Sequence, residues 1–447
     1  MFKRLLRNPY FIYLPFLLYY FYFIVVNKWP TLYGDEIRYR DFAWRLLHGY
    51  YSPPAPNINL WNGPGYPIVL SFFMALKQHA LFMTMTNAFF MYLGVVFLYQ
   101  SIKLLSNRKM ALLFSLPLAI YPNALVMLPI LYTEAFTGFL VSSLVYTLVL
   151  YHTKGSNKYL VASGLILGYL TLTKVIFGYV LILCLFTCMG LLLFKRNRAY
   201  HRASVKILLI AFAVTVPYLV YTYHVTGKLF YWGNSGGMSL YWMSTPYHNE
   251  YGDWKLPELN NNQYPELFKS PEGAAMLKKN HLKEITEILK HDNVEQDVLF
   301  KQAAIRNIEA HPLKFATNYY YNCARMLFNF PYSYSYQDAA IAGNIIRGSL
   351  LLWVSLFCLI VTVMNWQSVV YPVKFALLIT GIYLALSGAL SAYPRQLDVI
   401  VPVLLFWMAT TAFKMKRPSL KFAGNDDLDN ISIIELAGND VKDEVVK

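Results

Sequence analysis

Charged residues are scarce in this chain of 447 residues, and those present are divided unevenly by sign. Asp, Glu, Lys and Arg together make up 14% of the sequence, whereas typical soluble domains contain about 25%. Hydrophobic residues reach 57%, and apolar runs long enough to cross a bilayer, about 20 residues each, recur along the chain. This composition excludes a soluble globular enzyme and predicts an all-α polytopic membrane protein.

Cysteine is also scarce, and the four cysteines form neither a disulfide framework nor a zinc-binding spacing. Three of them lie in apolar runs, and Cys323 stands alone in a polar segment. The histidines lack the spacing of metal ligands. The glycine-rich stretch 233–237 does not follow a buried strand, so it is not a nucleotide-binding loop. The sequence therefore contains no signature of a metal-dependent or nucleotide-binding enzyme.

The net charge of +15 arises from basic residues that cluster between the apolar runs. This distribution follows the positive-inside rule, so it does not indicate a nucleic-acid partner. The basic clusters predict an integral protein of the plasma or inner membrane with both termini in the cytoplasm. They comprise Lys3, Arg4, Arg7, Lys103, Arg108, Lys109, Lys154, Lys158, Lys195, Arg196, Arg198, Arg202, Lys206, Lys414, Lys416 and Arg417.

The hydrophobic pattern predicts about ten transmembrane helices. They are expected at 9–27, 80–103, 111–131, 135–152, as two short spans within 159–194, and at 207–224, 344–365, 371–391 and 395–413. Residues 67–78 are too few to cross a bilayer and are expected to form a juxtamembrane helix.

Four regions follow from this topology. They are a transmembrane catalytic core at 1–224 with its first outer loop at 28–79, an outer-face loop domain at 225–343, C-terminal transmembrane helices at 344–415, and a disordered cytoplasmic tail at 416–447.

The segment after the first expected span places two adjacent carboxylates, Asp35 and Glu36, at the outer membrane surface. From Tyr39 to Tyr50 the apolar residues recur at helical spacing, so an amphipathic helix lying in the interface is expected, with Gly49 as its C-terminal stop. A structural explanation is also open. Asp35 could cap the helix, and Glu36 would be favoured in its first turn by the helix dipole.

The same topology brings Arg38, Glu134, Lys174 and Arg395 to the outer face. Ionisable groups near apolar segments are costly, so they are candidates for function. A carboxylate could accept the proton of an acceptor hydroxyl, and cations could stabilise an anionic leaving group such as a phosphate. Structural alternatives remain for each group. Lys174 and Arg395 could be interface residues that extend toward water, and Glu134 could begin a helix.

An ordered series of short motifs resembles the GT-C-type glycosyltransferases that use polyprenyl-phosphate sugars, in particular the protein O-mannosyltransferase and aminoarabinose transferase groups. The matching stretches are Asp35-Glu36-x-Arg38-Tyr39, Asn62-Gly63-Pro64-Gly65-Tyr66-Pro67, Tyr132-Thr133-Glu134, Leu172-Thr173-Lys174, Val216-Pro217-Tyr218, Thr226-Gly227 and Ala392-Tyr393-Pro394-Arg395. In the last of these the order of Arg and Tyr differs from the family pattern, and Tyr218 replaces a Trp. The resemblance covers about residues 1–415.

The resemblance implies that Asp35 is the catalytic residue of an inverting transfer at the outer face. The donor would be a polyprenyl-phosphate sugar, and the acceptor a hydroxyl or phosphate of a lipid, polysaccharide or protein. The residues expected to contact substrates are Glu36, Arg38, Tyr39, Asn62, Glu134, Lys174 and Arg395. No cofactor is required, although Glu36 and Glu134 could instead hold a divalent cation.

Two other classes of function stay open at this point. A secondary transporter or a lipid or glycolipid flippase would carry polar residues and broken helices at the middle of the membrane. Here the charges lie at the outer ends of the spans, and the chain shows no paired halves. A membrane scaffold without catalysis would not need the carboxylates at all.

Overall fold

The computed structural model describes residues 8–77, 79–194, 198–257, 259, 271–335 and 340–415. It divides into one large compact unit, Met1–Thr411, and a second unit, Ala412–Lys447. The predicted cytoplasmic tail, 416–447, lies outside the described residues, and so do parts of the predicted loop domain.

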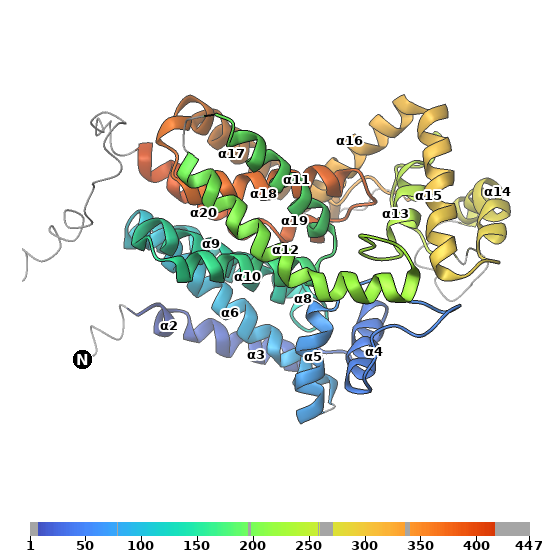
Figure 1. Cartoon of the computed structure of the whole chain (residues 1–447), viewed down its shortest axis with the longest axis horizontal. Coiled ribbons are helices and arrows are strands. Elements are labelled where there is room, and N and C mark those ends of the chain that lie inside the picture. The colour runs from blue at the N-terminus through green and yellow to red at the C-terminus, as the bar shows by residue number, and fades with distance from the viewer. Residues whose placement is uncertain are drawn as a thin grey trace, which may run out of the picture. The chain divides into compact units, whose positions relative to one another are not determined.

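Helices joined by loops make up the described residues, which contain no strand (Figure 1). In chain order the helices are α2 (Pro9–Ile12), α3 (Leu14–Asn27), α4 (Asp35–Leu47), α5 (Gly65–Leu76), α6 (Ala80–Leu105), α7 (Arg108–Ala119), α8 (Pro122–Met127), α9 (Glu134–Lys154), α10 (Asn157–Thr173), α11 (Ile176–Leu191), α12 (Arg198–Thr226), α13 (Gly236–Met243), α14 (Pro271–Ile288), α15 (Asn293–Ala310), α16 (Pro312–Phe328), α17 (Ala340–Met364), α18 (Tyr371–Gly388), α19 (Pro394–Asp398) and α20 (Val401–Met415).

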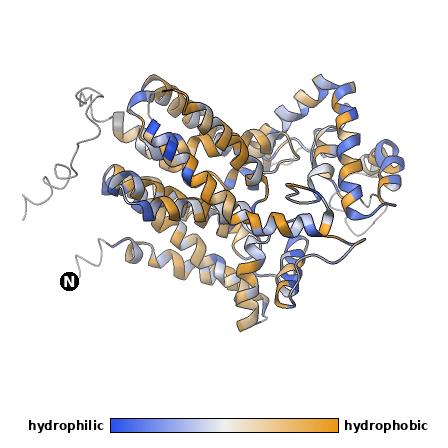
Figure 2. Cartoon of the chain, viewed as in Figure 1, coloured by the Kyte–Doolittle hydropathy of each residue, from blue (hydrophilic) through white to orange (hydrophobic). Residues whose placement is uncertain are grey.

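Five of these helices, α6, α9, α12, α17 and α18, are long and apolar enough to cross a membrane. Four shorter apolar helices, α3, α5, α11 and α20, accompany them. The apolar character of the group is visible in Figure 2. On α17 the large apolar side chains of Ile346 and Trp353 are about 70% exposed, as expected of a helix that faces lipid rather than protein. The all-helical membrane class is confirmed, whereas the count of ten spans stays a prediction.

Three predicted spans are not single helices, and this part of the prediction is wrong. The expected span 111–131 is divided into α7 and α8, and 395–413 into α19 and α20. The first span, 9–27, is interrupted at Tyr13 between α2 and α3. Proline explains the break after α7, because the ring of Pro122 forces Tyr121 into an extended conformation and cannot continue a helix from the preceding turn.

The predicted hairpin within 159–194 is confirmed, since α10 ends at Thr173 and α11 begins at Ile176. The short helix expected near 67–78 is also present as α5. Both predictions depended on length, because the run 159–194 is long enough for two short spans, whereas 67–78 is too short for one.

Helices α13–α15 have a hydrophobic core of their own within the predicted loop domain. It contains buried Tyr241, Trp242 and Phe300 together with Leu277 and Ile285. More of their residues are coloured hydrophilic than in the apolar helices (Figure 2). This segment is therefore a folded helical region rather than a linker.

Candidate functional site

Helix α4 begins directly after Gly34, whose positive φ of 55° suits glycine and sets the direction in which the helix leaves the preceding loop. Gly34 is the N-cap residue, and Asp35 is the first residue inside the helix. The structural explanation of Asp35 as the cap is therefore wrong, and its carboxylate remains available to other partners. The helix buries Tyr39, Phe42 and Ala43 and ends at Leu47, as its amphipathic pattern predicts.

The partners of Asp35 are two arginines. Arg38, one turn further along α4, donates from Nη2 to one carboxylate oxygen. Arg395, at the start of α19, donates from Nη1 to the other oxygen over 3.0 Å. Burial by itself would raise the pKa of the Asp35 carboxyl, but the charges of Arg395 and then Arg38 outweigh it and hold the pKa below its usual range. Asp35 is therefore ionised at neutral pH.

Arg38 is held in place from two further sides. Its Nε donates to Asn62 Oδ1 over 2.6 Å, and its guanidinium lies 4.9 Å from the centre of the Trp61 ring. Asn62 in turn donates from Nδ2 to the Tyr39 hydroxyl over 2.9 Å. Asp35, Arg38 and Tyr39 of α4 thus form one hydrogen-bonded group with Asn62 of the proline-rich turn at residues 62–67, and this group fixes the geometry at Asp35.

A second ion pair lies next to the first. Lys174, directly after α10, donates to Glu134 Oε1 over 3.2 Å, and Glu134 is the first residue of α9. The charge of Lys174 also contributes to the low pKa of Asp35, which places the two ion pairs near each other. Glu134 Oε2 is buried and has no hydrogen-bond partner in the described part of the chain. Lys174 and Arg395 therefore each face a carboxylate instead of only extending toward water.

Glu36 has a different environment from Asp35, although the two are adjacent. Its carboxylate accepts from Lys28 Nζ over 2.5 Å, from the Leu131 amide over 2.8 Å and from the Tyr33 amide over 3.2 Å. Glu36 is only 4% exposed. It joins the first loop to the segment before Glu134, and its expected contact with substrate stays a prediction.

Two of the sequence motifs pack directly against each other. A Cβ atom placed on Gly63 would lie 2.0 Å from the Leu172 carbonyl oxygen, and one on Gly65 would lie 2.4 Å from Thr173 Oγ1. Only glycine permits this approach. The turn that carries Asn62 is thereby fixed against the end of α10, just before Lys174.

Helix α16 fixes the segment that leads into Arg395. Arg325 is fully buried, and it donates to the carbonyl oxygens of Pro331 (2.7 Å), Tyr251 (2.6 Å) and Ala392 (3.3 Å). Asn322 donates to the carbonyl oxygen of Leu390 over 2.5 Å. These bonds hold the connection between α18 and α19, and so they position Arg395 over Asp35.

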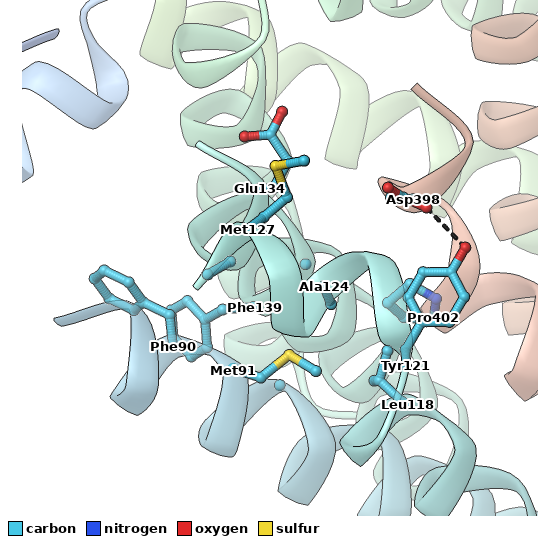
Figure 3. Close-up of a pocket in the computed structure, with 13 residues that line it drawn as sticks. Phe90, Met91, Leu118, Tyr121, Ala124, Met127, Glu134, Phe139, Asp398 and Pro402 are labelled. Atoms are coloured by element: carbon cyan, nitrogen blue, oxygen red, sulfur yellow. Dashed lines mark hydrogen bonds between the residues drawn. The ribbon is translucent and has the colours of Figure 1, made fainter. Parts of the chain in front are cut away.

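A largely apolar cavity adjoins Glu134 and is lined by residues of α6, α7, α8, α9, α19 and α20 (Figure 3). Phe90, Leu118 and Phe139 are among its apolar walls, and Asp398 is its second carboxylate. Asp398 accepts from the Tyr121 hydroxyl over 2.7 Å.

All eight predicted site residues thus lie in one region, although Glu36 is turned toward protein partners. Sequence reasoning gave no role to Lys28, Tyr132 and Asp398. The Arg395 guanidinium lies 5.8 Å from the centre of the Tyr132 ring. A usable signal existed for Asp398, which follows Arg395 by three residues and so shares its side of a helix. Among the described residues, no three His, Cys, Asp or Glu side chains gather in a way that could hold a metal.

Comparison with known protein families supports the resemblance to the protein O-mannosyltransferase group over part of the chain. Residues 62–221 match the family described as dolichyl-phosphate-mannose-protein mannosyltransferase. This segment includes Asn62, Glu134 and Lys174, whereas Asp35 and Arg395 lie outside it. No curated protein matches the chain.

Among solved structures, the chain is similar to the archaeal oligosaccharyltransferase AglB of Archaeoglobus fulgidus, in complex with an inhibitory peptide and a dolichol-phosphate. The identity is 13%, the TM-score is 0.49, and the match covers 90% of this chain and 50% of that one. It is also similar to ArnT of Cupriavidus metallidurans bound to undecaprenyl phosphate, with 13% identity, a TM-score of 0.41, and coverage of 88% and 76% respectively. The chain spans only half the length of the archaeal protein.

Proposed function

We propose that this protein is a membrane glycosyltransferase that moves a sugar from a polyprenyl-phosphate carrier to an acceptor hydroxyl at the outer face of the membrane. The observation that carries the proposal is the assembly around Asp35. An ionised carboxylate lies between two arginines and beside a lysine, at the ends of apolar helices. This arrangement supplies both a base and a cationic site for a leaving phosphate.

In the proposed reaction the acceptor oxygen attacks the anomeric carbon of the sugar. The new carbon–oxygen bond forms as the bond from that carbon to the phosphate oxygen breaks, and the electron pair leaves with the phosphate. The hydroxyl proton passes to Asp35. Attack from the side opposite the phosphate inverts the configuration at the anomeric carbon, and one carboxylate is sufficient for such a single displacement.

The two arginines also control how strong a base Asp35 is. While they pair with Asp35 its pKa is low, and a carboxylate with a low pKa is a weak base. A donor phosphate would compete for Arg395, whose side chain is 37% exposed and so is accessible. Transfer of this arginine to the phosphate would raise the pKa of Asp35. Donor binding would thereby strengthen the base before the acceptor reacts.

Lys174 is the second cation for the phosphate in this proposal, because its charge acts on Asp35 from its ion pair with Glu134 and its side chain is 20% exposed. The unpartnered oxygen of Glu134 would accept a hydrogen bond from a sugar hydroxyl.

Lys174→Ala should then raise KM for the donor at least tenfold, which a charge-assisted hydrogen bond permits, and Lys174→Arg should retain part of the affinity.

The proposal is tested with purified protein in vesicles that contain polyprenyl-phosphate sugars radiolabelled in the sugar, offered one sugar at a time. We expect loss of sugar from the lipid, with its appearance on an acceptor or in water. Movement of intact labelled lipid between leaflets without sugar release would contradict the proposal and favour a flippase.

A further inference from the structure

An open polar groove runs along one face of α4, beside the site. It is lined by Gly34, Ile37, Arg38, Asp41, Arg45 and Asn59. The residues from Gly34 to Arg45 recur at intervals of three and four, so they form a single stripe on the helix. With a rise of 1.5 Å per residue, the ten intervals from Asp35 to Arg45 correspond to roughly 15 Å.

The groove opens onto the candidate catalytic residue through Arg38. The guanidinium that lines the groove is the same one that contacts Asp35. The groove begins at Gly34, the residue directly before Asp35. A molecule lying in it would therefore have one end at Arg38, the residue that contacts the Asp35 carboxylate, and the other end at Arg45.

The charges in the groove are compensated except at its far end. Arg38 pairs with Asp35, and Asp41 pairs with Arg40 over 2.7 Å. Arg45 has no carboxylate within ion-pair distance in the described residues. Its guanidinium instead lies 5.6 Å from the centre of the ring of Phe42, a fully buried side chain. The guanidinium of Arg45 thus lies over a buried ring, and this cation–π contact helps to hold its charge in place for a ligand.

We infer that this groove holds the acceptor, and that the acceptor is an extended molecule with a phosphate or carboxylate group that pairs with Arg45. That group would lie roughly 15 Å from the hydroxyl that reacts at Asp35. The inference rests on the proposed function and specifies the acceptor for the same site. An arginine fork binds either anion through paired hydrogen bonds, so the two are chemically equivalent here.

The test uses purified protein in phosphatidylcholine vesicles, which carry no net charge, with radiolabelled polyprenyl-phosphate sugar as donor. The acceptor source is an extract of membranes from cells that express the protein. Two quantities are measured: sugar transferred to acceptor relative to sugar released to water, and retention of the labelled product on an anion-exchange column. The variants are Arg45→Gln and Arg45→Lys. Arg306→Gln is the matched control, because Arg306 is an exposed arginine on α15, away from the groove.

We expect an anionic product and a transfer-to-release ratio that falls about tenfold in Arg45→Gln, the loss typical of one hydrogen bond to a charged group. Arg45→Lys should lose less, and Arg306→Gln should behave as wild type. A neutral product, or an Arg45→Gln ratio equal to that of wild type, would overturn the inference while leaving the proposed function intact. An Arg45→Gln defect that appears only when phosphatidylglycerol is added would assign Arg45 to lipid headgroups and also overturn it. If wild type releases no sugar from any donor, the proposed function fails, and the inference fails with it.

Discussion

Asp35 and Glu36 are adjacent in sequence, yet the surroundings of their carboxylates differ and indicate different roles. Asp35 has two arginine partners and is 20% exposed in its side chain, whereas Glu36 is enclosed by Lys28 and two backbone amides. A base must be reachable by substrate, and a structural tether need not be. This contrast leads to opposite expectations for the two isosteric amide variants.

Asp35→Asn should lower transfer by at least about a hundredfold, because general-base contributions are typically 10²–10⁴ in rate. Its melting temperature should fall only slightly, since partly exposed ion pairs contribute about 1 kcal/mol or less. Glu36→Gln should show the reverse pattern, with a clear loss of thermal stability and a smaller loss of turnover at low temperature. Initial rates and scanning fluorimetry on both variants measure the two quantities. Near-normal turnover in Asp35→Asn would remove Asp35 from the chemistry.

The arginines around Asp35 predict the acid side of the pH profile. The pKa of Asp35 is lowered, so the carboxylate stays ionised until the pH falls below about 4, the usual value for Asp. If Asp35 is the base, kcat/KM of wild type should therefore persist down to that range and be lost below it. Arg395→Gln removes the largest of the charges that lower this pKa, so the acid limb should move to higher pH.

The measurement is kcat/KM for the donor as a function of pH in both proteins, with Arg306→Gln as the control. Rates are compared only over the range in which fluorimetry shows each protein folded. A wild-type acid limb near pH 6 would contradict the assignment, because a carboxylate whose pKa is lowered by two arginines stays ionised at that pH.

At the scale of elements, the packing of the proline-rich turn against the end of α10 fixes Asn62 relative to Lys174. Gly65→Ala would place a methyl group 2.4 Å from Thr173 Oγ1 and 2.7 Å from its amide nitrogen. The turn must then move away from α10. Overpacking of this kind typically costs about 1–3 kcal/mol, and it should also raise KM for the donor because Lys174 is displaced.

Gly381→Ala is the matched control for this change. Gly381 lies on α18, and a Cβ there meets nothing within 4 Å. In a helix interior the same substitution should leave stability unchanged or raise it by up to about 1 kcal/mol. Melting temperatures and donor KM for both variants provide the comparison. Equal behaviour of the two alanine variants would show that the turn does not depend on close contact with α10.

Elements with a strong local signal could be predicted from the sequence. The amphipathic spacing from Tyr39 to Tyr50 and the length of the run 159–194 were sufficient for α4 and for the α10–α11 hairpin. The break between α7 and α8 was missed because hydropathy remains high across it, and Pro117 and Pro122 look alike in sequence. Pro117 lies inside α7, whereas Pro122 starts α8.

Which residues of the site would meet was only partly predictable. Adjacent motifs and the alternation of basic loops place Asp35, Glu134 and Lys174 at the same end of the spans. The contact between Asp35 and Arg395 joins positions 360 residues apart, and it depends on buried hydrogen bonds from Arg325 to the segment before α19. Arg325 lies in a polar segment with no motif around it, so no local pattern could have indicated this role.

For the whole molecule, the proposal requires that the first loop and the α13–α16 region lie on the same side of the membrane, and that this side is outside. The fold requires the first of these conditions. The ring of Trp61, beside the site, lies 6.4 Å from that of Trp254, in the segment between α13 and α14. The second condition depends on the positive-inside rule, which places the connection between α9 and α10, with Lys154 and Lys158, in the cytoplasm.

Single cysteines in a cysteine-free background test both conditions with a membrane-impermeant thiol reagent on intact cells. Suitable exposed positions are Asn57 in the first loop, Asn249 after α13, and Asn157 at the start of α10. We expect Asn57→Cys and Asn249→Cys to react from outside, and Asn157→Cys only after permeabilisation. The reverse pattern would keep the fold and place the site in the cytoplasm, where the acceptor would be a cytoplasmic molecule. Labelling of Asn57→Cys and Asn249→Cys from opposite sides cannot be reconciled with the Trp61–Trp254 contact, and would separate Asp35 from the helices that position Arg395.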